Sequence, residues 1–358
     1  MVLVVDQAAP RHVVVAVSPL AELTACLHAL TEAEHHGATR AWRTEVREQL
    51  SPQLATKVRR YAPTWAAYRS RVLYPVTGGT DAADLEAELE AVATMPLDEF
   101  TRFSGFACAG GYSAVELEDP LRDTAQRSAL LAAARAGSTA RLELAEALLA
   151  DPERFRRDFL DFLAECRDTF FADTWTKVEA RLQQSAASMR DRLAREDLAS
   201  VLASLSQTAD ILTDPLRVVI DKFHHSVVNV GREGLRLVPS WYGWPHLTVK
   251  HEPQVTPLIQ FAVSGRRRLP LEHVRHRLDA LSDPRRLPLC RLIAREPLST
   301  LALAERVGMT EPQVSRHLRR LREAGLVRAE RDGRFVYYTL DVDEVARLGS
   351  DVLTTLFQ

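Results

Sequence analysis

The sequence predicts an α+β protein that is mainly helical and consists of two domains. Apolar residues make up 46% of the 358 residues, which is enough for more than one packed core. Helical periodicity runs through most of the first two hundred residues, and short β-rich runs between Gly and Pro follow at about 215–262. Residues 266–358 carry 18 Arg against 13 acidic residues, whereas the rest carries 28 basic and 35 acidic residues. We therefore expect an N-terminal domain at 1–262 and a basic C-terminal domain at 270–358.

The N-terminal domain is predicted to be helical up to about residue 206, after a short apolar strand at 12–17. Asp151 followed by Pro152 is a helix start, because Asp caps a helix and Pro is tolerated in its first turn. An apolar stripe at helical spacing follows, and we assign it to the core: Phe155, Phe159, Phe162, Cys166 and Phe170. The glycine-containing stretch 105–111 is predicted to be a loop, and it has no phosphate-binding pattern.

The β-rich end of this domain contains its most distinctive stretch, the aromatic run at 241–245. Strands are expected at 216–220, 226–230, 235–239, 247–250 and 258–263. Aromatic rings with polar atoms suit the walls of ligand pockets, although they equally suit cores. Trp241, Tyr242 and Trp244 are therefore candidate ligand-binding residues.

Cysteine usage and hydropathy predict a cytoplasmic protein. Four cysteines lie far apart without a CxxC or CxC pair, so a disulfide framework or a thiolate zinc site is poorly supported: Cys26, Cys108, Cys166 and Cys290. No apolar run reaches the roughly 18 residues of a membrane span. The first six residues lack the basic start of a signal peptide.

Motifs of catalysis are missing from the sequence. We find no GxSxG, HExxH, P-loop or dinucleotide fingerprint, so we assign no catalytic residue and no cofactor and expect no enzyme. An enzyme with an appended DNA-binding domain stays as an alternative. A metal-responsive protein is another, because four histidines of the β-rich region could converge: His224, His225, His246 and His251. Adjacent strand residues point to opposite faces, which argues against a shared metal at His224 and His225.

The C-terminal domain shows a continuous series of local folding signals. An apolar helix at 271–281 is followed by a helix opened by Ser282, Asp283 and Pro284. Pro288 falls inside that helix, which predicts a kink or a later start there. A short helix at 301–307 ends at Gly308, and Thr310 with Gln313 forms a capping box for the next helix. Two alternating strands around a turn at 332–333 and a last helix at about 342–356 complete the domain.

Helix, turn, helix and hairpin in this order predict a winged helix-turn-helix. In such a domain the helix after the turn enters the major groove of double-stranded DNA. Its Val314, Leu318 and Leu321 are expected to be buried. The expected DNA-binding residues lie off that stripe or beside the hairpin turn: Thr310, Gln313, Ser315, Arg316, Arg319, Arg320, Arg331 and Arg334.

Four segments of the domain closely resemble the ArsR/SmtB winged-helix repressors: residues 281–287, 303–310, 314–327 and 331–338. The resemblance covers about residues 271–357, a quarter of the chain. It implies a homodimer joined through the first and last helices of the domain, which represses transcription until an inducer binds. The larger part of the chain resembles an uncharacterised domain fused to such winged helices in some actinobacterial regulators.

The metal-binding positions that the resemblance implies are not filled by metal ligands. Where many family members have a CxC pair, this chain has Ser299 and Leu301. Where others use Asp and His on the last helix, this helix has no His. We therefore assign no metal, and we expect a small organic effector as the possible third partner beside DNA and a second copy of the chain.

Overall fold

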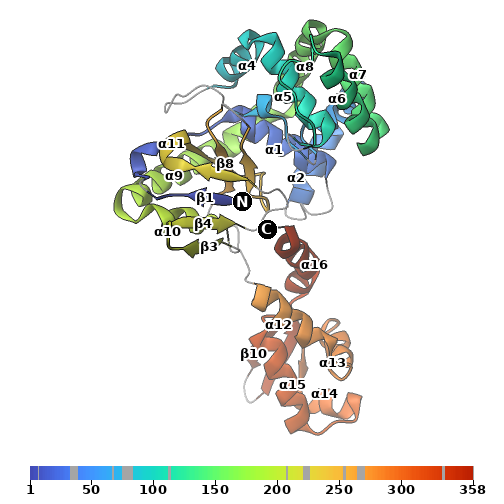
Figure 1. Cartoon of the computed structure of the whole chain (residues 1–358). Helices are drawn as coiled ribbons and strands as arrows, with labels where there is room; N and C mark the ends of the chain where they lie inside the picture. The colour runs from blue at the N-terminus through green and yellow to red at the C-terminus, as the bar shows by residue number, and fades with distance from the viewer. Residues whose placement is uncertain are drawn as a thin grey trace. The chain divides into compact units, whose positions relative to one another are not determined.

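A computed structural model describes residues 1–6, 8–32, 39–66, 68–74, 84–111, 114–206, 209–220, 226–252, 255–263, 271–332 and 335–357. The chain divides into two compact units, Met1–Gly265 and Arg266–Gln358, coloured blue to yellow and orange to red in Figure 1. The predicted class, mainly helical with a β-rich end followed by a winged helix, is confirmed. Among the described helices, none combines the length and apolar character needed to cross a membrane.

The first sheet of the N-terminal unit joins the start of the chain to strands more than two hundred residues later. Its order is β3-β4-β1-β5, and β1 runs antiparallel to β4 and parallel to β5. The strands are β1 (Val2–Val4), β3 (Ala209–Leu212), β4 (Arg217–Ile220) and β5 (Val227–Asn229). Leu3, Val218 and Val228 are fully buried, so the middle of this sheet is core.

The second sheet has three parallel strands and one antiparallel edge strand, in the order β2-β6-β8-β7. Its strands are β2 (Val13–Val15), β6 (Leu235–Ser240), β7 (Thr248–Lys250) and β8 (Leu258–Ala262). Helices α1 (Pro19–Thr31) and α9 (Ala172–Arg195) pack against β6. β6 and β8 are buried along their whole length, as expected for parallel strands covered by helices. The strand predicted at 12–17 is the shorter β2.

The remaining helices of this unit include a cluster of α4 to α8, drawn together in Figure 1. Their bounds are α2 (Arg40–Gln49), α3 (Pro52–Tyr61), α4 (Leu85–Thr94), α5 (Leu97–Ala109), α6 (Thr124–Gly137), α7 (Thr139–Ala150), α8 (Pro152–Cys166), α10 (Leu198–Ala203) and α11 (Val230–Glu233). Asp151 caps α8 by accepting from the Arg154 amide at 3.0 Å. The predicted stripe from Phe155 to Phe170 is buried, and burial also raises the pKa of the Cys166 thiol.

The loop predicted at 105–111 is wrong. Helix α5 continues through Gly105 to Ala109, and only Gly110 ends it, with a φ of 96°. A Cβ at Gly105 would stand 3.0 Å from a Leu117 methyl and 3.2 Å from Leu130. The glycine therefore permits close packing inside a helix. The sequence prediction missed this part of the helix because several glycines close together are typical of a loop.

A buried polar cluster holds the segment around Arg69 to the second sheet. Lys250 is 2% exposed, and its Nζ lies 3.3 Å from Glu252 and 3.5 Å from the centroid of the Tyr68 ring. Tyr68 donates to Glu252 at 2.6 Å, and the Arg71 guanidinium lies 3.6 Å from the same carboxylate. Burial lowers the pKa of Lys250 to about 8, against the opposing attraction of Glu252.

The C-terminal unit has its own core of helices and a small sheet of order β10-β11-β9. Its elements are α12 (Leu271–Ser282), α13 (Arg286–Ile293), β9 (Leu298–Ser299), α14 (Thr300–Val307), α15 (Glu311–Glu323), β10 (Val327–Asp332), β11 (Phe335–Leu340) and α16 (Val342–Phe357). The start predicted at Ser282–Pro284 is wrong, because α13 begins at Arg286. Asp283 instead holds a turn, accepting from the Arg285 amide at 2.8 Å. Pro288 is then the third residue of α13, where its missing N–H leaves no bond unmade and requires no kink.

Candidate nucleic-acid interface

Helix α15 is fixed by its cap and by one buried stripe. The Thr310 side chain caps it and Gln313 caps Thr310 in return, which is the capping box expected from the sequence. Val314, Leu318 and Leu321 are completely buried, as predicted. Gly325 ends the helix region with a φ of 71°, a conformation that glycine adopts without strain.

The opposite side of α15 is exposed and basic. Arg316 lies two residues from both Val314 and Leu318, so at 3.6 residues per turn it points away from the core. Arg316 and Arg320 are exposed, and neither forms an ion pair or hydrogen bond within the part of the chain that the structure describes. Arg319 lies 3.8 Å from Glu323, an exposed pair of little strength. Ser315 is exposed beside them.

Gln313 has the capping task that the sequence predicts. Its Oε1 accepts from the Thr310 amide at 2.9 Å and from the Thr310 hydroxyl at 3.1 Å. The side-chain oxygen is therefore engaged in the cap. The amide nitrogen of Gln313 is the group that remains to donate to an acceptor outside the helix.

The hairpin β10–β11 forms the wing. Its last described pair is Asp332 with Phe335, so Asp332, which the sequence placed in the turn, belongs to β10. Arg331 precedes it and is exposed. Arg334, the other expected contact of the wing, lies outside the described residues.

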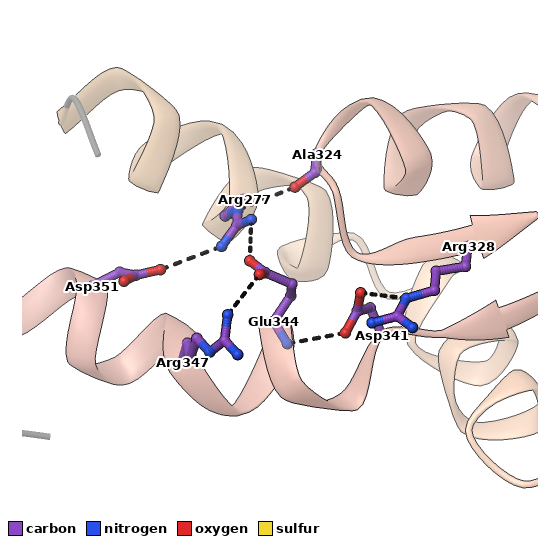
Figure 2. A network of polar contacts seen from close by, with 7 residues as sticks. All are labelled: Arg277, Ala324, Arg328, Asp341, Glu344, Arg347 and Asp351. Carbon is purple, nitrogen blue, oxygen red and sulfur yellow. Dashed lines mark hydrogen bonds and ion pairs between the residues drawn. The ribbon is translucent and has the colours of Figure 1, made fainter. Parts of the chain in front are cut away.

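A buried arginine joins three elements of the unit behind this surface (Figure 2). Arg277 of α12 is 1% exposed, and its Nε donates to the Ala324 carbonyl at 3.1 Å, at the C-terminal end of α15. Its two Nη atoms reach the α16 carboxylates, Glu344 at 2.5 Å and Asp351 at 3.3 Å. A Cβ on Gly325 would stand 3.3 Å from Arg277 Nη2, so the glycine also leaves room for the guanidinium. The sequence prediction missed Arg277, because a charged residue at an inner helix position is not marked by periodicity.

The helices that carry this network also expose apolar residues. α12 and α16 pack against each other. Leu271 is 63% exposed, Leu278 43% and Val342 58%. The inward face of α12 is formed instead by Val274, Arg277 and Ala280. The predicted stripe of leucines therefore faces outward in part, which leaves apolar surface on the two helices.

The positions at which the resemblance would place metal ligands have other tasks here. Ser299 caps α14 by accepting from the Ala302 amide at 3.3 Å, and Leu301 is 47% exposed. Asp341 pairs with Arg328 at 2.7 Å, and Asp351 pairs with Arg277. The Asp343 side chain lies outside the description.

The histidine and aromatic candidates of the N-terminal unit are separated by the fold. His246 Nε2 lies 3.2 Å from His28 Nε2, and His251 contacts Glu233 at 3.0 Å; His224 and His225 lie outside the described residues. Across the described ranges, no three His, Cys, Asp or Glu side chains are grouped as a metal site. Trp241 lies at a groove, whereas Tyr242 packs on Trp42 with ring centroids 4.3 Å apart. Trp244 is 6% exposed.

A helical core, a basic helix after a turn and a two-stranded wing define the C-terminal unit as a winged helix-turn-helix domain, and the comparisons place it in the ArsR/SmtB type. Residues 281–330 match the model of a helix-turn-helix domain. The chain as a whole belongs to the family of unknown function DUF5937, whose model matches residues 1–267.

The sequence relatives named here match about a fifth of this chain. The nodulation protein NolR of Rhizobium meliloti is 34% identical over 71 residues, which is 20% of this chain and 58% of NolR. The HTH-type transcriptional regulator KmtR of Mycobacterium tuberculosis is 40% identical over 73 residues, 20% of this chain and 56% of KmtR. The transcriptional repressor SdpR of Bacillus subtilis is 32% identical over 62 residues, 17% of this chain and 69% of SdpR. The chain thus spans little more than half the length of NolR and KmtR.

Solved structures with a local likeness cover a similar part of the chain. The winged helix-turn-helix domain of Mb0332 from Mycobacterium bovis is 34% identical and covers 24% of this chain and 80% of its own, with a TM-score of 0.21. NolR from Sinorhizobium fredii is 29% identical and covers 24% of this chain and 86% of its own, also with a TM-score of 0.21.

Proposed function

We propose that the protein is a cytoplasmic, homodimeric transcription repressor that is released from its operator by a small organic ligand. One observation carries the DNA-binding part of this proposal: Arg316 and Arg320 stand on the exposed side of α15 without a partner in the described chain. Free guanidinium groups on a helix that projects from a winged domain suit phosphates and the acceptor edge of guanine.

The proposed contacts divide into two kinds. Arg316 and Gln313 read base edges, because Arg316 lies opposite the buried stripe and Gln313 lies at the start of the helix. Thr310 and Ser315 add short polar contacts. The remaining arginines mostly contact phosphates: Arg319, Arg320, Arg331 and Arg334. Phosphate contacts fix the position of the protein, and base contacts specify sequence.

The proposed dimer forms through α12 and α16, because burial of their exposed apolar residues in an interface removes them from water. Leu278→Glu should abolish the dimer seen by light scattering, because it places a charge in the apolar contact. Leu301→Glu changes an equally exposed leucine on α14 and should leave the dimer intact. A monomeric wild type, or a dimer that survives Leu278→Glu, would contradict this arrangement.

The repressor role is proposed because several relatives carry that word in their names, including SdpR and the SmtB homologue of Synechocystis. The N-terminal domain, at 1–262, is proposed as the effector domain, and residues 270–358 as the DNA-binding domain. The deciding experiment is to incubate the full chain with sheared genomic DNA and to sequence the retained fragments. We expect fragments with a common two-fold symmetric site. Retention without any shared sequence would rule out specific regulation.

A further inference from the structure

A groove of about 400 Å³ opens beside the carboxyl ends of the parallel strands in the N-terminal unit. One wall is the face of α9 from Arg181 to Arg192. The other wall follows the strands directly: Trp241 comes after β6, and Phe261 and Val263 lie at the end of β8. In α/β folds, ligands bind outside the carboxyl ends of parallel strands, where the chain leaves the sheet. The groove volume suits a small organic molecule.

The loop that carries Trp241 is held rigidly. Glu22 is fully buried, and its carboxylate accepts from the amides of Trp241 at 3.0 Å and Tyr242 at 2.8 Å. It also accepts from the Ser240 hydroxyl at 2.6 Å, and Ser240 in turn accepts from the Gly243 amide. Because the backbone on both sides is fixed, the indole is preorganised at the groove.

Among its described lining residues, the groove carries one free positive charge and no carboxylate. Arg181 stands over the Trp241 ring with its guanidinium carbon 4.6 Å from the centroid. Within the described chain it makes no ion pair and no hydrogen bond. Arg192, at the other end, is occupied by two 2.8 Å bonds to Glu196 and one to Ser204. An arginine that already rests on an aromatic ring offers its edge to an anion at little further ordering cost.

We propose that this groove binds a planar organic carboxylate, such as an aromatic acid. The carboxylate pairs with the edge of Arg181, and the ring lies along Trp241 over the apolar surface of Met189, Phe261 and Val263. Hydroxyl and amide groups on the same face of α9 can bond further polar substituents. The role of such an acid as the releasing ligand rests on the proposed function, whereas its binding does not.

The test is calorimetry on the full chain without DNA, using benzoate, 2-naphthoate and indole-3-carboxylate, each beside its neutral amide. We expect at least one acid to bind and its amide to bind far more weakly. Arg181→Gln should weaken that acid about tenfold to a hundredfold, the value of a hydrogen bond to a charged group. Arg195→Gln is the matched control: it removes an exposed arginine of the same helix about 21 Å further along and should change nothing.

Two results would overturn the groove assignment: binding of none of the three acids, or equal loss in Arg181→Gln and Arg195→Gln. Trp241→Leu keeps the charge and removes the ring, and it should also lower the affinity. A separate titration of the operator complex distinguishes the two proposals. Acid binding that leaves DNA affinity unchanged supports the groove and contradicts release by this ligand. Operator binding by a chain that binds no acid contradicts the groove alone.

Discussion

Arg277 of α12 donates a hydrogen bond to the carbonyl oxygen of Ala324, where helix α15 ends. The last carbonyls of a helix lack partners within it and carry partial negative charge, so a guanidinium is a favourable cap. The same side chain binds Glu344 and Asp351 of α16. The orientation of the exposed basic helix is therefore tied to the two helices that carry the uncovered apolar surface.

Arg277→Met should destabilise the C-terminal unit by about 2–4 kcal/mol. Removing one partner of a fully buried ion pair costs about 3–5 kcal/mol. The cost is lower here because Glu344 and Asp351 keep 16% and 18% of their side-chain surface exposed. Hydrogen exchange of the full chain, read by mass spectrometry in α12, α15 and α16, measures the local opening. Arg275→Ala removes an exposed arginine of the same helix, paired with Asp279 at 3.9 Å, and should leave the protection within about 0.5 kcal/mol. Equal protection in both variants would show that the network carries no stability.

Arg316→Ala should lower affinity for the selected operator by about 1–3 kcal/mol and relax one position of each half-site. Arg320→Ala should weaken all sequences similarly and reduce the slope of log K against log salt by about one for each phosphate that is no longer neutralised. Fluorescence anisotropy at several salt concentrations separates the two. Arg135→Ala, an exposed arginine of α6 in the other unit, is the control. Wild-type affinity in Arg316→Ala would refute the recognition role of α15.

The N-terminal unit should lose stability as pH rises from about 4.5 to 7 because of Glu88. Burial raises the pKa of Glu88 to about 7 from its usual 4.5, despite the bond it accepts from the Leu20 amide at 2.7 Å. The folded state binds the Glu88 proton more tightly than the unfolded chain does. The resulting contribution to the free energy of unfolding is therefore complete below pH 4.5 and is lost as pH rises through 7, a change of about 3 kcal/mol. All five tryptophans lie in this unit, so urea unfolding followed by their fluorescence reports on it. Glu88→Gln should remove this part of the pH dependence, and an unchanged slope would contradict the assignment.

Lys250 should make the N-terminal unit more stable as pH rises above about 8. Its pKa is lowered to about 8, so the folded state holds its proton less tightly than the unfolded chain. The penalty is therefore full below pH 8 and is relieved between 8 and 10.5, by about 3 kcal/mol. The difference in unfolding free energy between wild type and Lys250→Met isolates this effect, because the other titrating groups are present in both proteins. A difference that is constant from pH 7 to 11 would mean that the pKa of Lys250 is the same in the folded and unfolded states, which would contradict the assignment.

The C-terminal unit could be predicted almost element by element because its signals are local. Thr310 with Gln313, Gly308 and Gly325 mark boundaries within a few residues of the bonds they make. The fold of the N-terminal unit could not be predicted in this way, because β1 and β2 pair with distant strands and nothing in the sequence of either strand identifies its partner. Candidate site residues follow the same rule: those set by local structure could be predicted, and those set by distant contacts could not. The exposed arginines of α15 follow from helix geometry, whereas the pairing of Arg181 with Trp241 depends on a contact across 60 residues of chain.

The pairing of β1 and β2 with strands beyond residue 216 sets an order of events during synthesis. Val2 pairs with Val219, and Val13 pairs with Leu235, so neither strand has a partner until most of the unit has left the ribosome. At about 5–20 residues per second, translation of that length takes roughly 10–50 s. During that interval the backbone N–H and C=O groups of the apolar segments Val2–Val4 and Val13–Val15 have no strand partner. A nascent chain stalled before residue 216 should therefore expose both segments to chaperones and proteases, and release of the stall should bury them.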